Sequence, residues 1–307
     1  MTKDIGPQYE LDDSFKAAAR LHQSNYRARV LKVDYSEYGN RLPDVDGRAL
    51  LNYYDGLTVR ETLRRRYPEF SKERDADLLR SEHIPFNMLA PLAGRPALTR
   101  IVLKEAFDLE LNGPFEMEIE WAPPPTDKCK YLGDMTSFDT FVKGVGANGE
   151  QVGVGIEVKY TERGYRIGKS EAGRVRDRES TYWVTTRESG LFVGGGCDQL
   201  AEDDLRQIWR NHLLGLAMVR QNVIARFVSV TLYPAGNKHF THALTKYQSH
   251  LEETAQKSVR GCTFEQYIDC LRGDSEIEAW KQYLMARYLI EDPAFQQHTT
   301  DGTSRRR

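Results

Sequence analysis

Cysteine is scarce in this sequence of 307 residues, and the four cysteines lie far apart at Cys129, Cys197, Cys262 and Cys270. No two of them form a CxxC pair, so a structural zinc site has no support in the sequence. A disulfide framework is typical of short secreted chains and is not expected in a chain of this length. The simplest interpretation is a protein with reduced thiols.

Long apolar runs are also missing. No stretch approaches the 18 consecutive apolar residues that a membrane span needs, and the first residues, MTKDIGPQYELDD, lack the apolar segment of a signal peptide. We therefore expect a soluble, cytoplasmic protein with no membrane partner. Hydrophobic residues still make up 40% of the chain, which is enough for a sizeable core.

Excess charge of either sign is small, with a formal net charge of −2 and a pI near 6.4. Such a surface does not attract phosphate on average. A nucleic-acid partner would therefore need a local basic patch.

Periodicity divides the chain into regions. Residues 13–31 and 57–67 have helical patterns, and we interpret residues 1–70 as an N-terminal helical extension. Residues 71–290 are expected to form the main domain, and residues 291–307 a flexible tail. The main domain carries predicted strands at 116–121, 136–145, 151–161 and 226–233, and predicted helices at 203–221, 244–255 and 275–290. This order predicts an α/β protein with a central mixed sheet, whose middle is an antiparallel hairpin turning at Asn148-Gly149.

The strand from Gln151 places a carboxylate beside an ammonium. Alternate residues of a strand share one face, so Glu157 and Lys159 project together, after Gly153 and Gly155 on the same face. Two glycines in a strand often mark the close approach of a ligand. The competing interpretation is an ordinary Glu–Lys pair on a solvated sheet face, and these two residues alone do not decide between them.

Asp139 on the preceding strand favours a metal site. Two carboxylates held close together repel each other unless a cation or a raised pKa compensates. Magnesium is commonly held by one or two carboxylates together with water and substrate phosphate. Lys159 would then orient an attacking water and offset charge on the transition state.

This site requires Asp139 and Glu157 to lie on the same face of the hairpin, which depends on whether the number of residues in its loop is odd or even. A two-residue loop at Asn148-Gly149 would set Asp139 opposite Val158 and aim it into the apolar face. A three-residue loop, Ala147-Asn148-Gly149, sets Asp139 opposite Glu157, with Gly149 suited to the left-handed conformation. A bulge at Gly144 or Gly146 would correct the parity equally well. We predict such an odd-residue irregularity.

The pattern of Asp139, a hairpin and then Glu157-Val158-Lys159 after the apolar strand VGVGI resembles the D…ExK core of the PD-(D/E)XK, or restriction-endonuclease-like, nucleases. Phe138 stands where many members have proline. Residues 81–87 (SEHIPFN) and 207–214 (QIWRNHLL) further resemble a bacterial restriction-endonuclease branch of this superfamily. The resemblance covers roughly residues 80–235 and implies a restriction-endonuclease-like fold.

The resemblance also implies supporting residues. Glu82 would be a further acidic group and metal ligand, and Gln207 would help to position the site. Both have structural alternatives. Glu82 could instead lie in the first turn of a helix capped by Ser81, where a carboxylate suits the helix dipole. His83 is more often a packed residue than a ligand, and Asn211 is at least equally expected on a solvated helix face.

Basic residues follow the predicted catalytic strand. They lie between 163 and 178, with aromatic residues among them at 165 and shortly after them at 182 and 183, a combination that suits contact with phosphate and bases. Acidic neighbours dilute this charge, so a solvated loop is the alternative. The predicted nucleic-acid contacts are Arg174, Arg176, Arg178 and Arg210.

Together these features predict a Mg²⁺-dependent phosphodiesterase acting on DNA, with Mn²⁺ as a possible substitute. The rival hypothesis is a non-catalytic nucleic-acid-binding or assembly module that keeps the nuclease fold. A third is an unrelated α/β protein with a surface Glu–Lys pair. The sequence leaves open RNA as a substrate, the strandedness of the substrate, and the oligomeric state, for which a homodimer is one option.

Overall fold

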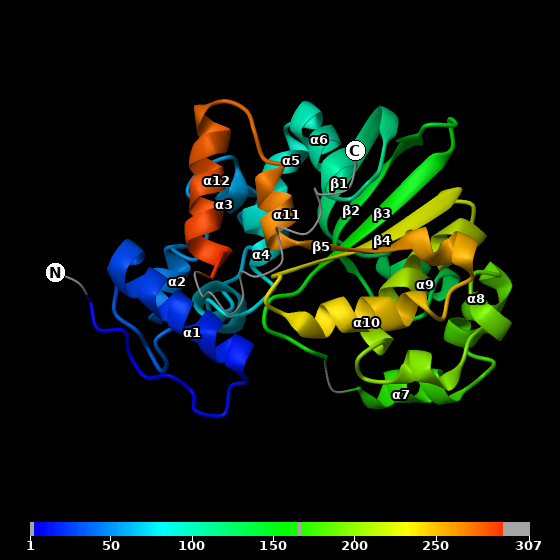
Figure 1. Cartoon of the computed structure of the whole chain (residues 1–307), viewed down its shortest axis with the longest axis horizontal. Coiled ribbons are helices and arrows are strands. Elements are labelled where there is room, and N and C mark those ends of the chain that lie inside the picture. Colours follow the sequence, from blue (N-terminus) through cyan, green and yellow to red (C-terminus); the bar gives the residue numbers. More distant parts are fainter. Residues whose placement is uncertain (1–2, 165–166, 291–307) are drawn as a thin grey trace, which may run out of the picture.

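A five-stranded mixed sheet forms the centre of the computed structural model, which describes residues 3–164 and 167–290 (Figure 1). The strands lie in chain order across the sheet: β1 (Leu111–Trp121), β2 (Phe138–Gly146), β3 (Gln151–Val158), β4 (Arg226–Tyr233) and β5 (Val259–Thr263). The pairs β1–β2 and β2–β3 are antiparallel, whereas β3–β4 and β4–β5 are parallel. The predicted mixed sheet with an antiparallel hairpin at its centre is confirmed.

Helices cover both faces of the sheet (Figure 1). The N-terminal region and the region before β1 supply α1 (Ser14–Tyr26), α2 (Asp44–Arg48), α3 (Val59–Arg66), α4 (Ile84–Met88), α5 (Ala90–Ala93) and α6 (Pro96–Glu105). The rest of the described chain supplies α7 (Lys169–Arg176), α8 (Thr181–Ser189), α9 (Arg206–Arg220), α10 (Lys238–Gln248), α11 (Phe264–Asp269) and α12 (Ser275–Tyr288). Within residues 3–164 and 167–290, none of the helices has the length and apolarity required to span a bilayer.

Two hydrophobic cores lie on opposite faces of the sheet. One face of β3, with Val154, Ile156 and Val158, packs with the helices α3 to α6, α11 and α12. The other face packs with α8, α9 and α10, mainly through aromatic and leucine side chains. Because both faces are covered, the strands β3 and β4 are buried along nearly their whole length.

The glycines of β3 serve this packing. A Cβ on Gly155 would lie 2.6 Å from the ring of Phe138 and 2.8 Å from that of Phe227. A Cβ on Gly153 would lie 2.6 Å from Ile224. The expectation that these two glycines leave room for a ligand is therefore wrong, because side chains of the protein fill that space.

The hairpin between β2 and β3 has the predicted parity. Its ladder runs from Thr140 opposite Ile156 to Val145 opposite Gln151. The Gly146 N–H then donates to the Glu150 carbonyl at 2.9 Å, which leaves a loop of three residues, 147–149, with Gly149 at φ +82°. The same register places Asp139 at the position that faces Glu157, one step beyond the last pair of the ladder.

The C-terminal part contains the main error of the sequence prediction. We expected one helix over residues 244–255, but α10 starts and ends earlier and is followed by a 3₁₀ segment (Glu253–Ser258) and the unpredicted strand β5. This strand has only five residues, VRGCT, and pairs along one side with β4. So short a segment, containing Gly and Arg, carries no periodic signal.

The N-terminal helices pack directly against the rest of the chain. Gln23 of α1 donates hydrogen bonds to the Tyr160 hydroxyl at 2.6 Å and to the Arg287 carbonyl at 2.7 Å. The division of the chain at residue 70 stays a prediction, and the expected tail at 291–307 lies outside the described residues.

The packing of Gly155 gives a stability prediction. Gly155→Ala should lower the free energy of unfolding by about 1–3 kcal/mol, because the new methyl group overlaps rigid aromatic rings. Gly173→Ala is the matched control, since no heavy atom lies within 4 Å of its added Cβ and the site is helical. The free energy of unfolding of that control should stay the same or rise by up to about 1 kcal/mol. Equal urea midpoints for Gly155→Ala and wild type would contradict the packing account.

Candidate active site

Glu157 and Lys159 lie at the end of β3 and form a buried ion pair. The Lys159 Nζ donates to Glu157 Oε1 at 2.5 Å, and Lys159 is 7% exposed and Glu157 9% exposed. The alternative of an ordinary surface pair on a solvated sheet face is therefore wrong. Burying two charges in this way is costly and is tolerated only when further polar groups compensate.

Asp139 completes the group from the second residue of β2. Its Oδ2 accepts a hydrogen bond of 2.6 Å from the Val158 N–H, so the carboxylate takes the place of a main-chain partner where the β2–β3 ladder ends. Burial raises the pKa of Asp139 well above its ordinary value, and the nearby carboxylates of Glu157 and Glu120 raise this pKa further. Lys159 and the Val158 N–H oppose the shift without cancelling it.

The charge on Lys159 depends on these carboxylates. Burial alone would lower its pKa, but Glu157 and Asp139 attract the proton strongly enough that the pKa of Lys159 is raised. The ammonium therefore stays protonated although it is buried.

Gln207 approaches the same carboxylate from α9. Its Nε2 donates to Glu157 Oε1 at 2.7 Å, so this oxygen accepts from both Lys159 and Gln207. The structure thus brings Gln207 into contact with the ExK strand. Asn211, one turn further along α9, is buried and does not lie on a solvated face.

Glu120 is a further acidic group that sequence reasoning missed. It follows Ile119, which pairs with Thr140, and precedes Trp121, which pairs with Phe138, so its register position faces Asp139. Its backbone has φ +58°, a conformation uncommon for a residue with a side chain. The strict alternation of residues 116–121 suggested only an outward polar face, and the register between β1 and β2 could not be counted across the long connection between them.

Two residues at the end of α3 hold Glu120 in place. The Tyr67 hydroxyl donates to Glu120 Oε2 at 2.9 Å, and the Arg66 guanidinium donates to the Glu120 carbonyl at 2.7 and 3.1 Å. Burial raises the pKa of Glu120 to about 7, with Glu157 and Glu82 adding to the rise and the hydrogen bond from Tyr67 opposing it.

Glu82 lies at the rim of this cluster. It precedes α4, whose N-terminal cap is His83, so the expectation that Ser81 caps a helix containing Glu82 is wrong. The Glu82 side chain is 46% exposed and forms a salt bridge of 2.6 Å with Arg80. Its charge nevertheless contributes to the raised pKa of Glu120.

His83 is a packed residue. It is fully buried, stacks on Tyr288 and makes an edge contact with Tyr53. Burial lowers its pKa well below the ordinary value. These contacts favour the structural role over that of a ligand.

Most of the arginines predicted to contact nucleic acid interact with other groups of the protein. Arg174 donates to the Gly133 carbonyl at 2.6 Å, and Arg210 donates to Thr136 Oγ1 at 3.0 Å. Arg178 pairs with Asp198 and stacks on Trp183. Arg176 is exposed on α7, which occupies much of the segment expected to be a loop; Tyr165 and Arg166 lie outside the described residues.

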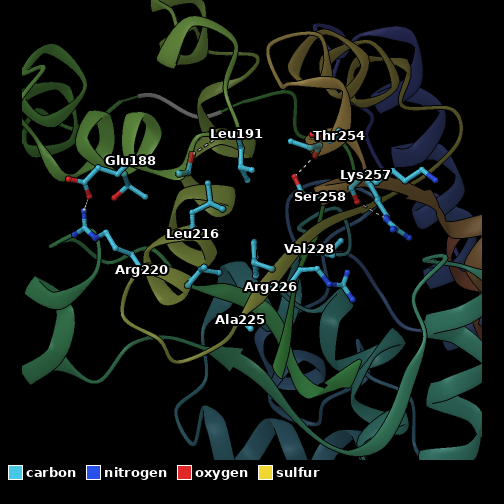
Figure 2. Close-up of a pocket in the computed structure, with 16 residues that line it drawn as sticks. Glu188, Leu191, Leu216, Arg220, Ala225, Arg226, Val228, Thr254, Lys257 and Ser258 are labelled. Carbon is cyan, nitrogen blue, oxygen red and sulfur yellow. Dashed lines mark hydrogen bonds and ion pairs between the residues drawn. The ribbon is translucent and has the colours of Figure 1, made fainter. Parts of the chain in front are cut away.

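A ligand-sized cavity of about 550 Å³ lies elsewhere, at the start of β4 (Figure 2). Leu216 and Val228 contribute apolar lining, and Arg226 and Lys257 line it as cations. Glu157 pairs with Thr231 of β4, five residues beyond Arg226 along that strand. None of the predicted catalytic residues lines this cavity.

The carboxylates suit a hard divalent cation in their chemistry. Asp139 and Glu157 offer oxygen donors. Burial is the main cause of the raised pKa of Asp139, and the neighbouring carboxylates, whose charge a cation would offset, raise it further. In the part of the chain that the structure describes, no set of three or more His, Cys, Asp or Glu side chains is arranged to hold a metal. Asp139 and Glu157 would supply two of the ligands of such a cation, with water and substrate phosphate completing its coordination.

The raised pKa of Glu120 predicts a pH-dependent stability in metal-free buffer. The folded pKa of about 7 exceeds the ordinary 4.5, so folding is progressively disfavoured as pH rises between these values. Glu120→Gln removes this effect and keeps an acceptor for Tyr67. Its free energy of unfolding should match wild type near pH 4.5 and exceed it near pH 8 by about 1–3 kcal/mol. Parallel pH profiles for the two proteins, measured by urea denaturation, would contradict the burial of a charged Glu120.

Comparison with known families agrees with the fold. The model of the PD-(D/E)XK nuclease superfamily matches residues 10–290, most of the chain. No curated protein and no solved structure matches significantly. The match confirms the resemblance drawn from the sequence motifs and the restriction-endonuclease-like fold, and it removes the alternative of an unrelated α/β protein. The chain belongs to the PD-(D/E)XK nuclease superfamily.

Proposed function

We propose that this protein is a Mg²⁺-dependent endonuclease that hydrolyses phosphodiester bonds of DNA, with Mn²⁺ able to replace Mg²⁺. The observation that carries the proposal is the group of side chains that meet at the end of β3. Lys159 touches Glu157, Gln207 touches the same carboxylate oxygen, and Asp139 lies on the adjacent strand.

Asp139 and Glu157 would hold the cation. Asp139 Oδ2 is engaged by the Val158 N–H, which fixes the carboxylate and leaves Oδ1 for a ligand. The cation, when bound, supplies a Lewis acid that neutralises charge on the scissile phosphate and lowers the pKa of a nucleophilic water. Glu82, exposed at the rim, is proposed as a supporting acidic group.

Lys159 and Gln207 would prepare the site for the reaction. The Lys159 ammonium is held within hydrogen-bond reach of Glu157, from where it orients the attacking water and offsets negative charge in the transition state. Gln207 fixes the orientation of the Glu157 carboxylate through its hydrogen bond of 2.7 Å.

The rival, a non-catalytic nucleic-acid-binding or assembly module, predicts binding without cleavage. The mutual contacts of Glu157, Lys159 and Gln207 favour catalysis, because a binding module has no need to maintain a buried ion pair of this geometry. Incubation of the protein with supercoiled plasmid and linear DNA, in Mg²⁺, Mn²⁺ or EDTA, separates the two. An endonuclease nicks or linearises the plasmid in Mg²⁺ and Mn²⁺ and leaves it intact in EDTA.

Single substitutions at the core should abolish this cleavage. Asp139→Ala, Glu157→Ala and Lys159→Ala are each expected to lower the rate by about 10²-fold or more, because each removes a charge placed for the transition state. In metal-free buffer Asp139→Asn should fold at least as stably as wild type, since it relieves carboxylate repulsion and keeps an acceptor for the Val158 N–H.

Glu116→Ala is the matched control for these variants, because Glu116 is an exposed carboxylate on β1. It should cut at the wild-type rate. Wild-type cleavage by any of the three core variants would show that the active site has been assigned to the wrong residues.

A further inference from the structure

Three consecutive arginines, Arg64, Arg65 and Arg66, end α3 beside the candidate active site. All three are exposed. The neighbouring arginines on either side are in salt bridges, Arg60 with Asp55 at 3.0 Å and Arg74 with Asp75 at 2.7 Å. Within residues 3–164 and 167–290, no acidic side chain forms a salt bridge with any of the three.

The end of α3 is joined to the acidic cluster by hydrogen bonds. Arg66 donates to the Glu120 carbonyl, and Tyr67, the residue after the helix, donates to the Glu120 carboxylate. Glu120 in turn interacts electrostatically with Glu157 and Asp139. The end of α3 is therefore linked to the proposed catalytic carboxylates through Arg66, Tyr67 and Glu120.

A polyanionic substrate needs cations at this place. The carboxylates of the site repel a phosphate backbone, and the Lys159 ammonium is already paired with Glu157. Further along the chain, Arg174, Arg178 and Arg210 are held by contacts within the protein. Of the three arginines of α3, Arg66 is anchored to the Glu120 carbonyl, whereas the exposed Arg64 and Arg65 are in no salt bridge among the described residues. Consecutive residues of a helix point about 100° apart, so the side chains of Arg64 and Arg65 reach different positions along a strand.

We infer that the C-terminal turn of α3 binds the phosphate backbone of DNA and holds it at the active site, with Arg64 and Arg65 as the contact residues and Arg66 anchoring the turn to Glu120. This inference rests on the proposed function for its choice of DNA. It gives a substrate-binding role to the N-terminal region, for which the sequence suggested no chemistry. The competing explanation is that basic residues merely stabilise the C-terminal end of a helix.

Binding measured as a function of salt distinguishes these explanations. The experiment follows the fluorescence anisotropy of a labelled DNA duplex titrated with full-length protein in EDTA, where no cleavage is expected, over a series of salt concentrations. Removing one arginine that neutralises a phosphate lowers the slope of log K against log salt by about 0.9. Arg64→Gln/Arg65→Gln should thus lower the slope by roughly 1.8 and weaken binding at least about tenfold at low salt.

The matched control is Arg226→Gln/Lys257→Gln, which removes the same charge from the rim of the distant cavity (Figure 2). It should keep the wild-type slope and affinity. A wild-type slope for the α3 variant, or an equal reduction in the control, would overturn the inference. So would a lowered unfolding temperature of the α3 variant with unchanged DNA binding, which is the result expected of a helix-stabilising role.

The plasmid assay separates failure of the inference from failure of the proposed function. If the wild type cuts plasmid and the α3 variant binds DNA as the wild type does, the inference fails and the function stands. If the wild type binds DNA with a slope that depends on α3 but cuts nothing in Mg²⁺ or Mn²⁺, the inference stands and the nuclease proposal fails. If the wild type does not bind DNA, both fail.

Discussion

Repulsion between buried carboxylates is the constraint on which the rest of this site depends. Asp139 and Glu157 lie on the adjacent strands β2 and β3. Glu120 lies on β1, at the register position that faces Asp139. Burial raises the pKa values of Asp139 and Glu120, and neighbouring carboxylates raise both further. The fold therefore makes it costly for these carboxylates to be ionised together, as is common where function, and not stability, selects the residues.

Different parts of the fold position each group around that charge. The three-residue loop ending at Gly149 sets the register of Asp139. Glu157 lies on β3, and Lys159 directly follows the end of that strand. From one side α9 supplies Gln207, while the N-terminal helices supply Tyr67 and Arg66 from another. The family match, which begins at residue 10, includes these N-terminal helices. The helices before the sheet thus help to position the candidate site through Arg66 and Tyr67.

The structure could be predicted from the sequence where a local pattern determines it. The parity of the hairpin followed from counting residues between Asp139 and Glu157, and the helical spacing placed Gln207 on α9. The sequence was insufficient where distant segments meet. Glu120 could not be recognised because its partner Tyr67 lies 53 residues away, and Gly155 could not be assigned to packing without the positions of Phe138 and Phe227. The internal hydrogen bond of Arg174 could not be anticipated for the same reason, since its acceptor is the carbonyl of Gly133, 41 residues away.

Binding of a divalent cation to Asp139 and Glu157 is the central claim, and isothermal titration calorimetry with Mn²⁺ tests it directly. Because the pKa of Asp139 is raised, cation binding must displace protons, and the measured heat at mildly acidic pH should depend on the ionisation enthalpy of the buffer. The account predicts binding with proton release in the wild type, and loss of that binding in Asp139→Asn. Binding of equal affinity and equal proton release in both proteins would contradict it.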